Sequence, residues 1–184
     1  MTTHEIMLKW VIMTRVRKEQ KEDLEAIHEV NRKAFGQEKE AVLVRNIRKS
    51  SGFIPELSLV AERDFQVVGH ILFSRMHIET SHGEVEVLSL APLAILPEYQ
   101  NRGIGSQLVR TGLKRCRELG HKIVIVVGHP SYYPRFGFVP AGQKGLDAPI
   151  PIPDEAFMVC ELVPDALAGK EGKVKFPPEF ADAI

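Results

Sequence analysis

The chain has few cysteines, no long apolar run and no surplus of either charge. Its 184 residues include two cysteines, Cys116 and Cys160, which are too few for a disulfide framework and lack the spacing of metal ligands. No uncharged apolar stretch approaches the ~20 residues of a membrane span. The 24 basic side chains balance the 24 acidic ones, which removes the usual electrostatic basis for binding nucleic acid or a membrane surface. We therefore expect neither kind of partner.

The amino-terminal segment MTTHEIMLKWVIM lacks the features of a secretory signal, which are a basic start, an apolar stretch and a small-residue cleavage site. Together with the low cysteine content, this predicts a cytoplasmic protein. A chain of 184 residues can bury a sizeable core in one domain. We predict a single domain over residues 1–184, with its core at about 11–162 and a tail at 163–184.

Apolar residues recur along the chain with helical and extended periods in turn. Helical spacing predicts helices at residues 21–35, 38–50 and 107–119. Runs rich in β-branched residues predict strands at 11–17, 57–63, 66–80, 83–95, 121–128 and 156–162. Short polar turns indicate antiparallel hairpins in the middle of the chain, and the third helix joins two strands as a β-helix-β unit. This order predicts an α/β (α+β) fold with a mixed, mostly antiparallel central sheet and flanking helices.

The last forty residues have a different composition. AGQKGLDAPIPIPDEAF, residues 141–157, is rich in Pro and Gly and predicts an ordered surface loop, since a strand candidate follows it. The segment VPDALAGKEGKVKFPPEFADAI, residues 163–184, is expected to form a short turn of helix and an irregular tail.

The segment QNRGIGS, residues 100–106, joins an apolar strand to the third helix. A helix N-terminus presents unpaired N–H groups and a partial positive charge, which suits a phosphate. Gly103 and Gly105 lack a β-carbon, so such a group can approach the backbone closely. The spacing fits neither the phosphate loop of nucleoside triphosphatases nor the dinucleotide fingerprint. A tight turn without a ligand is the alternative at this point.

Two motifs in order resemble the GNAT superfamily of acyl-CoA-dependent N-acetyltransferases. The family loop reads [Gln/Arg]-x-x-Gly-x-[Gly/Ala], and QNRGIG matches each fixed position. Beyond the next strand, HPSYYPRFGF resembles the second motif, a Tyr four residues before a Gly-Phe pair, which Tyr133 satisfies. The element order is similar to the family's from residue 11 to about 138. YYPRFGF, the Pro-rich loop and KFPPEF also resemble a bacterial and archaeal branch of predicted acetyltransferases.

The resemblance implies a binding site for acetyl-CoA, the cosubstrate, without a metal. In the family, the strand before the loop bulges and splays from the strand after the helix, and the pantetheine arm pairs in the wedge like an extra strand. Pro92, which cannot donate to a sheet ladder, supports such a break. The resemblance assigns the arm to the backbone of Leu93, Ala94 and Ile95. It assigns the pyrophosphate to the loop residues Gln100, Asn101, Arg102, Gly103, Ile104, Gly105 and Ser106.

The resemblance also assigns the chemistry. Tyr133 would act as the general acid that protonates the departing thiolate, although Tyr133 packed beneath the sheet, or its neighbour Tyr132, is an alternative. A backbone N–H near Ile95 would polarise the thioester carbonyl. Relatives often place a basic carboxylate at the position of Ser89, and a serine there can only hold a water molecule. Cys116 has no motif around it that supports an acyl-cysteine mechanism.

No general base is assigned from the sequence. Unless a bulge intervenes, Glu84 and Glu86 alternate to the face opposite Ser89. His70 and His77 lie on the preceding strand, where an isolated histidine is more often a surface or structural residue than a catalytic one. We predict an acyltransferase that moves an acetyl group to a primary amine by direct attack in a ternary complex. A non-catalytic acyl-CoA sensor is the alternative. The acceptor, a small molecule or a protein, is open, and relatives suggest a homodimer.

Overall fold

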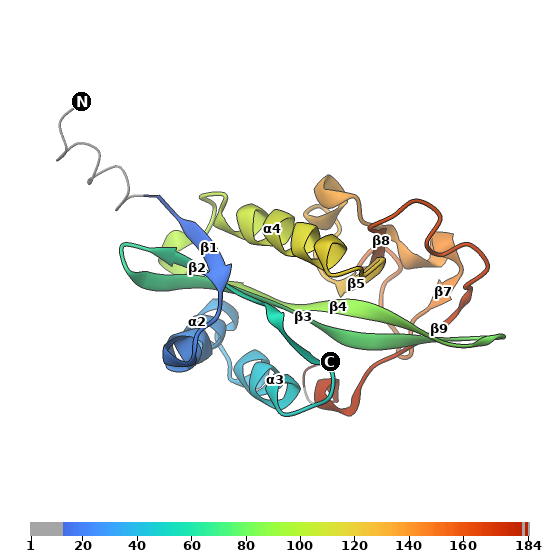
Figure 1. Ribbon diagram of the computed structural model, residues 1–184, viewed down its shortest axis with the longest axis horizontal. Helices are drawn as coiled ribbons and strands as arrows, with labels where there is room; N and C mark the ends of the chain where they lie inside the picture. Colours follow the sequence, from blue (N-terminus) through green and yellow to red (C-terminus); the bar gives the residue numbers. More distant parts are fainter. Residues whose placement is uncertain (1–12, 182, 184) are drawn as a thin grey trace.

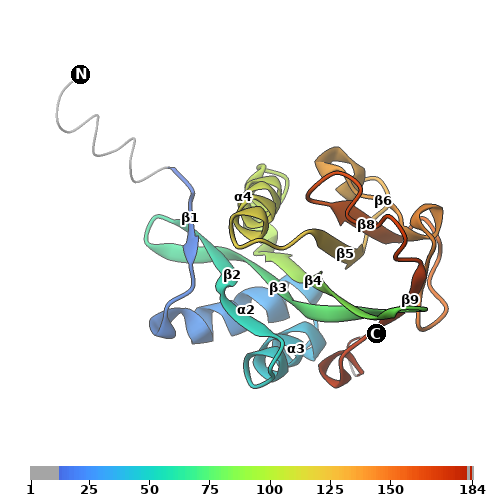
Figure 2. The same cartoon turned by 45° about the vertical axis from the view of Figure 1, so that its right-hand side comes forward.

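The computed structural model describes residues 13–181 and residue 183. One twisted sheet forms the middle layer (Figures 1 and 2). Helix α4 covers one face, while α2 and α3 cover the other, where the carboxyl-terminal segment also lies (Figure 1). No helix in the described ranges has the length and apolar character that crossing a membrane requires.

The three α-helices found in residues 13–181 lie close to the predicted ranges. They are α2 (Leu24–Phe35), α3 (Lys39–Arg48) and α4 (Ile104–Glu118). Short 3-10 turns occupy Lys21–Asp23, Pro97–Tyr99, Tyr133–Phe136, Ala141–Lys144 and Pro178–Phe180. Gly36, in the left-handed conformation, ends α2.

The long strands of the sheet are the ones predicted. They are β2 (Phe53–Arg63), β3 (Gln66–Thr80), β4 (Gly83–Ile95), β5 (Ile123–Val127) and β8 (Phe157–Glu161). The shorter strands are β1 (Arg15–Lys18), β6 (Val139–Pro140), β7 (Leu146–Asp147) and β9 (Gly172–Lys175). The order is β1-β2-β3-β4-β5-β8-β6, and among the strands of the described residues only the β4–β5 and β7–β9 pairs are parallel. The prediction of a mixed, mostly antiparallel sheet is confirmed.

Both ends of the chain differ from the sequence prediction. The first strand begins at Arg15, and the part of the predicted strand before residue 13 lies outside the described residues. The carboxyl-terminal segment is not an irregular tail, because β9 pairs antiparallel with the far end of β3 at His77–Thr80. Phe180 is then buried against the core. The segment beyond residue 162 therefore contributes a strand to the sheet.

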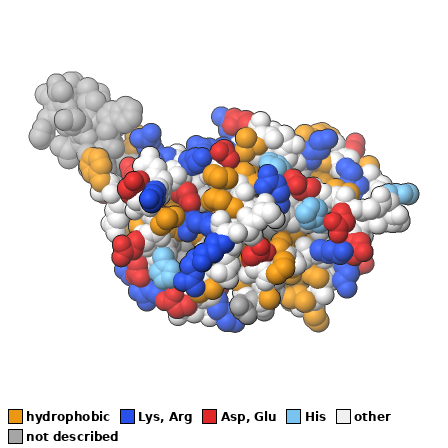
Figure 3. All heavy atoms as spheres, turned by 60° about the horizontal axis from the view of Figure 1, so that its bottom comes forward, with side chains coloured by type: hydrophobic (Ala, Val, Ile, Leu, Met, Phe, Trp, Pro, Cys, Tyr) orange, Lys and Arg blue, Asp and Glu red, His pale blue; other side chains and the backbone are white. Residues whose placement is uncertain are grey.

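The face of the molecule that carries α2, α3 and the carboxyl-terminal segment shows interspersed basic and acidic side chains (Figure 3). Neither sign covers a large area in this view. This arrangement agrees with the balanced composition of 24 basic and 24 acidic residues. Attraction of a ligand on this side must therefore come from local groups rather than from a surface field.

A buried polar network lies between the sheet and α2, in which Asn31 Oδ1 has no partner among the described residues. The His70 side chain on β3 is 0% exposed. Its Nδ1 accepts from the Asn31 side-chain amide at 3.1 Å, and its Nε2 lies 3.0 Å from Ser58 Oγ. Ser58 in turn donates to the Glu19 carboxylate, which Arg48 also binds. This arrangement fits one state only, a neutral imidazole with its proton on Nε2.

Burial strongly disfavours the charged form of this imidazole. It lowers the pKa of His70 from 6.5 to about 3, with a smaller contribution from the Arg48 charge. His70 is therefore a structural residue of the core, in agreement with the expectation from the sequence. With no path for a substrate to the 0% exposed ring, the Ser58–His70 pair is not a nucleophile and base.

We expect His70 to make stability depend on pH. Below about pH 6.5 the unfolded chain binds a proton at His70 and the folded chain does not, so stability is complete above this pH and falls as the pH is lowered toward 3. Urea unfolding should show about 2 kcal/mol of this loss between about pH 7 and pH 5. His70→Gln should flatten that part of the profile, whereas the exposed His82→Gln should not. Parallel profiles for wild type and His70→Gln would contradict the assignment.

Candidate active site

The site begins where β4 and β5 part. These parallel strands pair at only two positions, Leu88 with Val124 and Ser89 with Ile125. Beyond them β4 continues to Ile95, and the two strands no longer pair. A cleft of about 1040 Å³ opens there, bordered by β4, β5, the loop 100–106 and Tyr133. The splayed wedge expected from the sequence is present.

The exposed edge of β4 within this cleft has a defined set of free backbone groups. The register with β3 shifts at Ala91–Pro92, which marks a bulge on β4. After it, Leu96 N–H donates to Val68 O at 2.9 Å. Antiparallel pairs alternate, so Ala94 also bonds to β3, while Leu93 and Ile95 turn their backbone groups toward the cleft. The assignment of Ala94 to the pantetheine arm is therefore corrected, and Leu93 and Ile95 stay predictions.

The loop 100–106 delivers an uncompensated helix N-terminus to the cleft. Gly103 caps α4 with φ +81°, and no acidic side chain lies in the first turn. No described residue accepts from the N–H groups of Ile104, Gly105 and Ser106, the first intrahelical donor being Gln107. Three free N–H groups and the helix dipole therefore point at one place, which is an arrangement that binds phosphate.

The individual loop side chains do different things. Gln100 donates to Ile95 O at 3.0 Å and so fixes the loop to the end of β4. Asn101 adopts φ +58° and borders the cleft. Arg102 stacks over the Tyr99 ring at 5.6 Å and is outside the cleft lining, so its prediction as a ligand has no contact in its favour.

Tyr133 reaches the cleft from the 3-10 turn after β5. Its ring is 7% exposed and packs so closely on Gly128 that a β-carbon there would lie 2.4 Å from Cε2. Phe138 holds the ring edge-on with centroids 5.6 Å apart. Burial raises the pKa of the Tyr133 phenol, so the hydroxyl keeps its proton well above neutral pH. A fixed, protonated phenol at this place is suited to donate a proton.

Tyr132 is a second cleft residue, which the sequence raised only as an alternative to Tyr133. Its hydroxyl lies 3.5 Å from Ser106 Oγ, and a β-carbon on Gly105 would approach it to 2.9 Å. Arg135 stacks on its ring at 4.8 Å. Tyr132 therefore sits over the N-terminus of α4, while Tyr133 lies deeper. The sequence motif alone does not distinguish the two tyrosines, and only the folded 3-10 turn shows that their side chains occupy different places.

Ser89 lies at the base of the cleft and is 4% exposed. It is directly opposite Ser74 of β3, so the two hydroxyls share one face of the sheet. The carboxylates nearest in sequence are engaged elsewhere, Glu84 with Lys175 at 3.2 Å and Glu86 with Arg75 at 3.5 Å. Neither carboxylate is placed to act as a base beside Ser89, and the general base stays unassigned.

Cys116 is a buried core residue of α4. Its side chain is 0% exposed, and burial raises the pKa of the thiol to about 12. A thiol in that state is a poor nucleophile at neutral pH, so the structure gives an acyl-cysteine mechanism no support. No group of three or more His, Cys, Asp or Glu residues in the described part of the chain is placed to hold a metal.

The sequence reasoning did not predict that the carboxyl-terminal segment joins the helices of residues 21–50 in one wall of the cleft. This wall comes from the ends of α2 and α3 and from the carboxyl-terminal segment: Ala34, Phe35, Glu40, Leu43, Phe176, Phe180 and Ala183. The spacing in sequence between these two groups is far too great for a local pattern to join them. Only the pairing of β9 with β3 brings Phe176 and Phe180 here.

A family model described as an acetyltransferase (GNAT) domain matches residues 15–141. The chain belongs to the GNAT acetyltransferase family. The match covers both the loop and the Tyr133 turn, and the fold around them is the one that the motifs predicted. The family implied by those motifs in the sequence is thus confirmed.

Curated relatives and solved structures agree with this membership. The uncharacterized N-acetyltransferase YjhQ of Escherichia coli K12 is 46% identical over 136 residues, which are 73% of this chain and 75% of YjhQ. The crystal structure of E. coli YhbS, a GNAT N-acetyltransferase in complex with CoA, has a TM-score of 0.85 at 33% identity and covers 92% of both chains. A GNAT acetyltransferase from Brucella melitensis in complex with acetyl-CoA has a TM-score of 0.75 at 32% identity, covering 91% of this chain and 98% of the other.

Proposed function

We propose that this chain transfers an acetyl group from acetyl-CoA to a primary amine by direct attack in a ternary complex. The observation that carries the proposal is the parting of β4 from β5 after two residue pairs, with the N-terminus of α4 and Tyr133 both bordering the gap. The complexes of YhbS with CoA and of the Brucella protein with acetyl-CoA support the choice of donor.

The free groups of the cleft fit the parts of acetyl-CoA. The pyrophosphate suits the N–H groups of Ile104, Gly105 and Ser106, because they lack acceptors among the described residues. The amide-bearing pantetheine arm suits the turned-out backbone of Leu93 and Ile95, to which it can add as a short strand. Ile95 O already accepts from Gln100, so its N–H is the group left for the ligand.

The reaction then requires that the departing thiolate gain one proton and that the attacking amine lose one. The acceptor nitrogen attacks the thioester carbon, the C–S bond breaks, and the thiolate takes the proton of the Tyr133 hydroxyl. A backbone N–H of the free β4 edge near Ile95 stabilises the carbonyl oxygen as negative charge develops on it. Ser89 holds a water molecule that carries the proton of the attacking amine to solvent. Tyr133 regains its proton from solvent as CoA leaves.

A non-catalytic acyl-CoA sensor is the second candidate. The observation that favours it is Ser89, a group without basic character, at the base of the cleft. The two candidates share the donor site and differ in turnover. Consumption of acetyl-CoA in the presence of a panel of amines therefore separates them.

We expect Gly103→Ala to weaken acetyl-CoA binding about tenfold, measured by isothermal titration calorimetry. An added β-carbon meets no atom within 4 Å, so the effect comes from strain at φ +81° that turns the N–H groups away from the phosphate. Gly120→Ala at the other end of α4 is the matched control, with φ +85° and equally open space. Both variants should lose about 1 kcal/mol of stability. Equal affinity losses in the two would remove the loop from the donor site.

We expect Tyr133→Phe to lower kcat about a hundredfold with little change in the affinity for acetyl-CoA, because it removes the proton donor but keeps the packed ring. Tyr132→Phe, whose hydroxyl lies over the helix N-terminus, should mainly alter the affinity for the donor. Steady-state kinetics with one amine acceptor checks both. If Tyr132→Phe has the larger effect on kcat, the acid is Tyr132, and if neither variant is impaired, neither is the acid.

A further inference from the structure

A second cavity, which we call the tail pocket, adjoins the acetyl-CoA cleft. It has a volume of about 330 Å³ and lies between the end of α3, the middle of β3 and the carboxyl-terminal segment. Phe176 and Phe180, stacked with centroids 6.1 Å apart, line both the tail pocket and the cleft. Ser74 lines the tail pocket, and its partner Ser89 across the strands lines the cleft. The two spaces are therefore neighbours on one face of the sheet.

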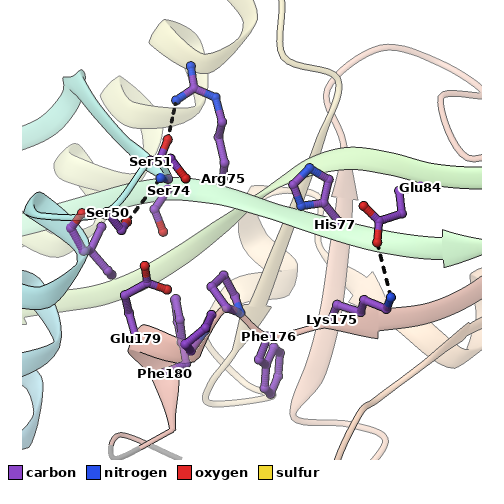
Figure 4. A pocket seen from close by; sticks show the side chains of 14 residues that line it. Ser50, Ser51, Ser74, Arg75, His77, Glu84, Lys175, Phe176, Glu179 and Phe180 are labelled. Atoms are coloured by element: carbon purple, nitrogen blue, oxygen red, sulfur yellow. Dashed lines mark hydrogen bonds and ion pairs between the residues drawn. The ribbon is translucent and has the colours of Figure 1, made fainter.

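The tail pocket contains two buried polar atoms without partners. Within the described chain, Ser74 Oγ and Glu179 Oε2 have no hydrogen-bond partner. Ser74 is 1% exposed. The Glu179 carboxylate points toward Ser74 and Ser50 (Figure 4). A carboxylate oxygen removed from water without a partner is costly, so a site that keeps one is suited to a ligand that supplies the missing donor.

The other charges around the tail pocket are compensated. Lys175 binds Glu79 at 3.1 Å and Glu84 at 3.2 Å. Arg75 lies 3.5 Å from Glu86 and donates to the backbone carbonyls of Ser51 and Phe53. His77 lies beside Glu84, on the opposite side of the pocket from Glu179 (Figure 4). The charged group left without a partner is thus the Glu179 carboxylate, a negatively charged hydrogen-bond acceptor, which favours a cationic ligand.

We propose that the tail pocket is an acceptor subsite in which Glu179 and Ser74 bind a second cationic group of an amine acceptor. This inference rests on the proposed acetyl transfer. The acceptor class is a diamine or a longer polyamine: one ammonium group is held by Glu179, and the other nitrogen reaches the thioester beside Ser89. Residues directly opposite on neighbouring strands have β-carbons about 5 Å apart, a span that a short alkyl chain covers. The apolar rings of Phe176 and Phe180 contact that chain.

The test compares cadaverine with pentylamine, which has the same chain and one amine fewer. We expect kcat/KM for cadaverine to exceed that for pentylamine about tenfold or more, and Glu179→Gln to remove the difference through a higher KM for cadaverine. Glu171→Gln is the matched control, an exposed carboxylate of the same segment outside both cavities. Glu40→Gln tests whether the ammonium group is held instead by the Glu40 carboxylate, which borders the cleft from α3 and accepts from Gln37.

Two further measurements keep this proposal separate from the proposed function and from a structural role of Glu179. Calorimetric binding of cadaverine to the protein–CoA complex, lost in Glu179→Gln, tests the subsite even where no amine is turned over. Because Glu179 leaves a buried oxygen without a partner, Glu179→Gln without ligand should melt no lower than wild type. Equal use of both amines, loss of the preference in Glu40→Gln instead, or no binding of cadaverine would each overturn the proposal. Turnover of pentylamine without a diamine preference would leave the transferase intact and remove the subsite.

Discussion

The early parting of β4 and β5 is the constraint on which the rest of the site depends. A parallel pair that stops after Ser89 and Ile125 leaves β4 with a free edge inside the molecule. Buried backbone groups need partners, so this edge is stable only if water or a ligand with amide groups meets it. The bulge at Ala91–Pro92 decides which residues face the gap, and it selects Leu93 and Ile95 rather than Ala94.

The elements on either side of the gap determine how a ligand is oriented in it. The loop between β4 and α4 is fixed to Ile95 by Gln100, so the N–H groups of α4 lie near the end of the free edge. Close packing keeps this helix in place, since a β-carbon on Gly112 would lie 2.3 Å from the Phe73 ring. The turn after β5 places Tyr133 against Gly128 on the other wall. A ligand that satisfies β4 therefore has its anionic end at the helix and its other end beside a protonated phenol.

The sequence predicts those parts of the site that are local. The loop, its glycines and the Tyr133 turn are short segments whose conformation depends on neighbours within a few residues, and the order of long strands follows from the hydrophobic pattern. The side of β4 toward which the Ala94 backbone forms its hydrogen bonds could not be predicted, because it depends on where the bulge in β4 lies relative to β3. Strand β9, with sequence GKVK, has too little apolar pattern to predict, and its partner lies about a hundred residues earlier. Phe176, Phe180 and Glu179 were missed for the same reason.

His70 and Ser74 are two buried polar residues of β3 with different surroundings. His70 has a partner on each ring nitrogen, and its network reaches Glu19 and Arg48 without a gap, so burial there fixes one charge state and one geometry. Ser74, four residues along the same strand, is as deeply buried and has no partner in the described chain. A core does not gain from such a hydroxyl, and an alanine would fill the place at lower cost. Ser74 lies opposite Ser89 and lines the same cavity as Glu179, so the proposed amine acceptor, crossing from one cavity to the other, would give both groups a partner.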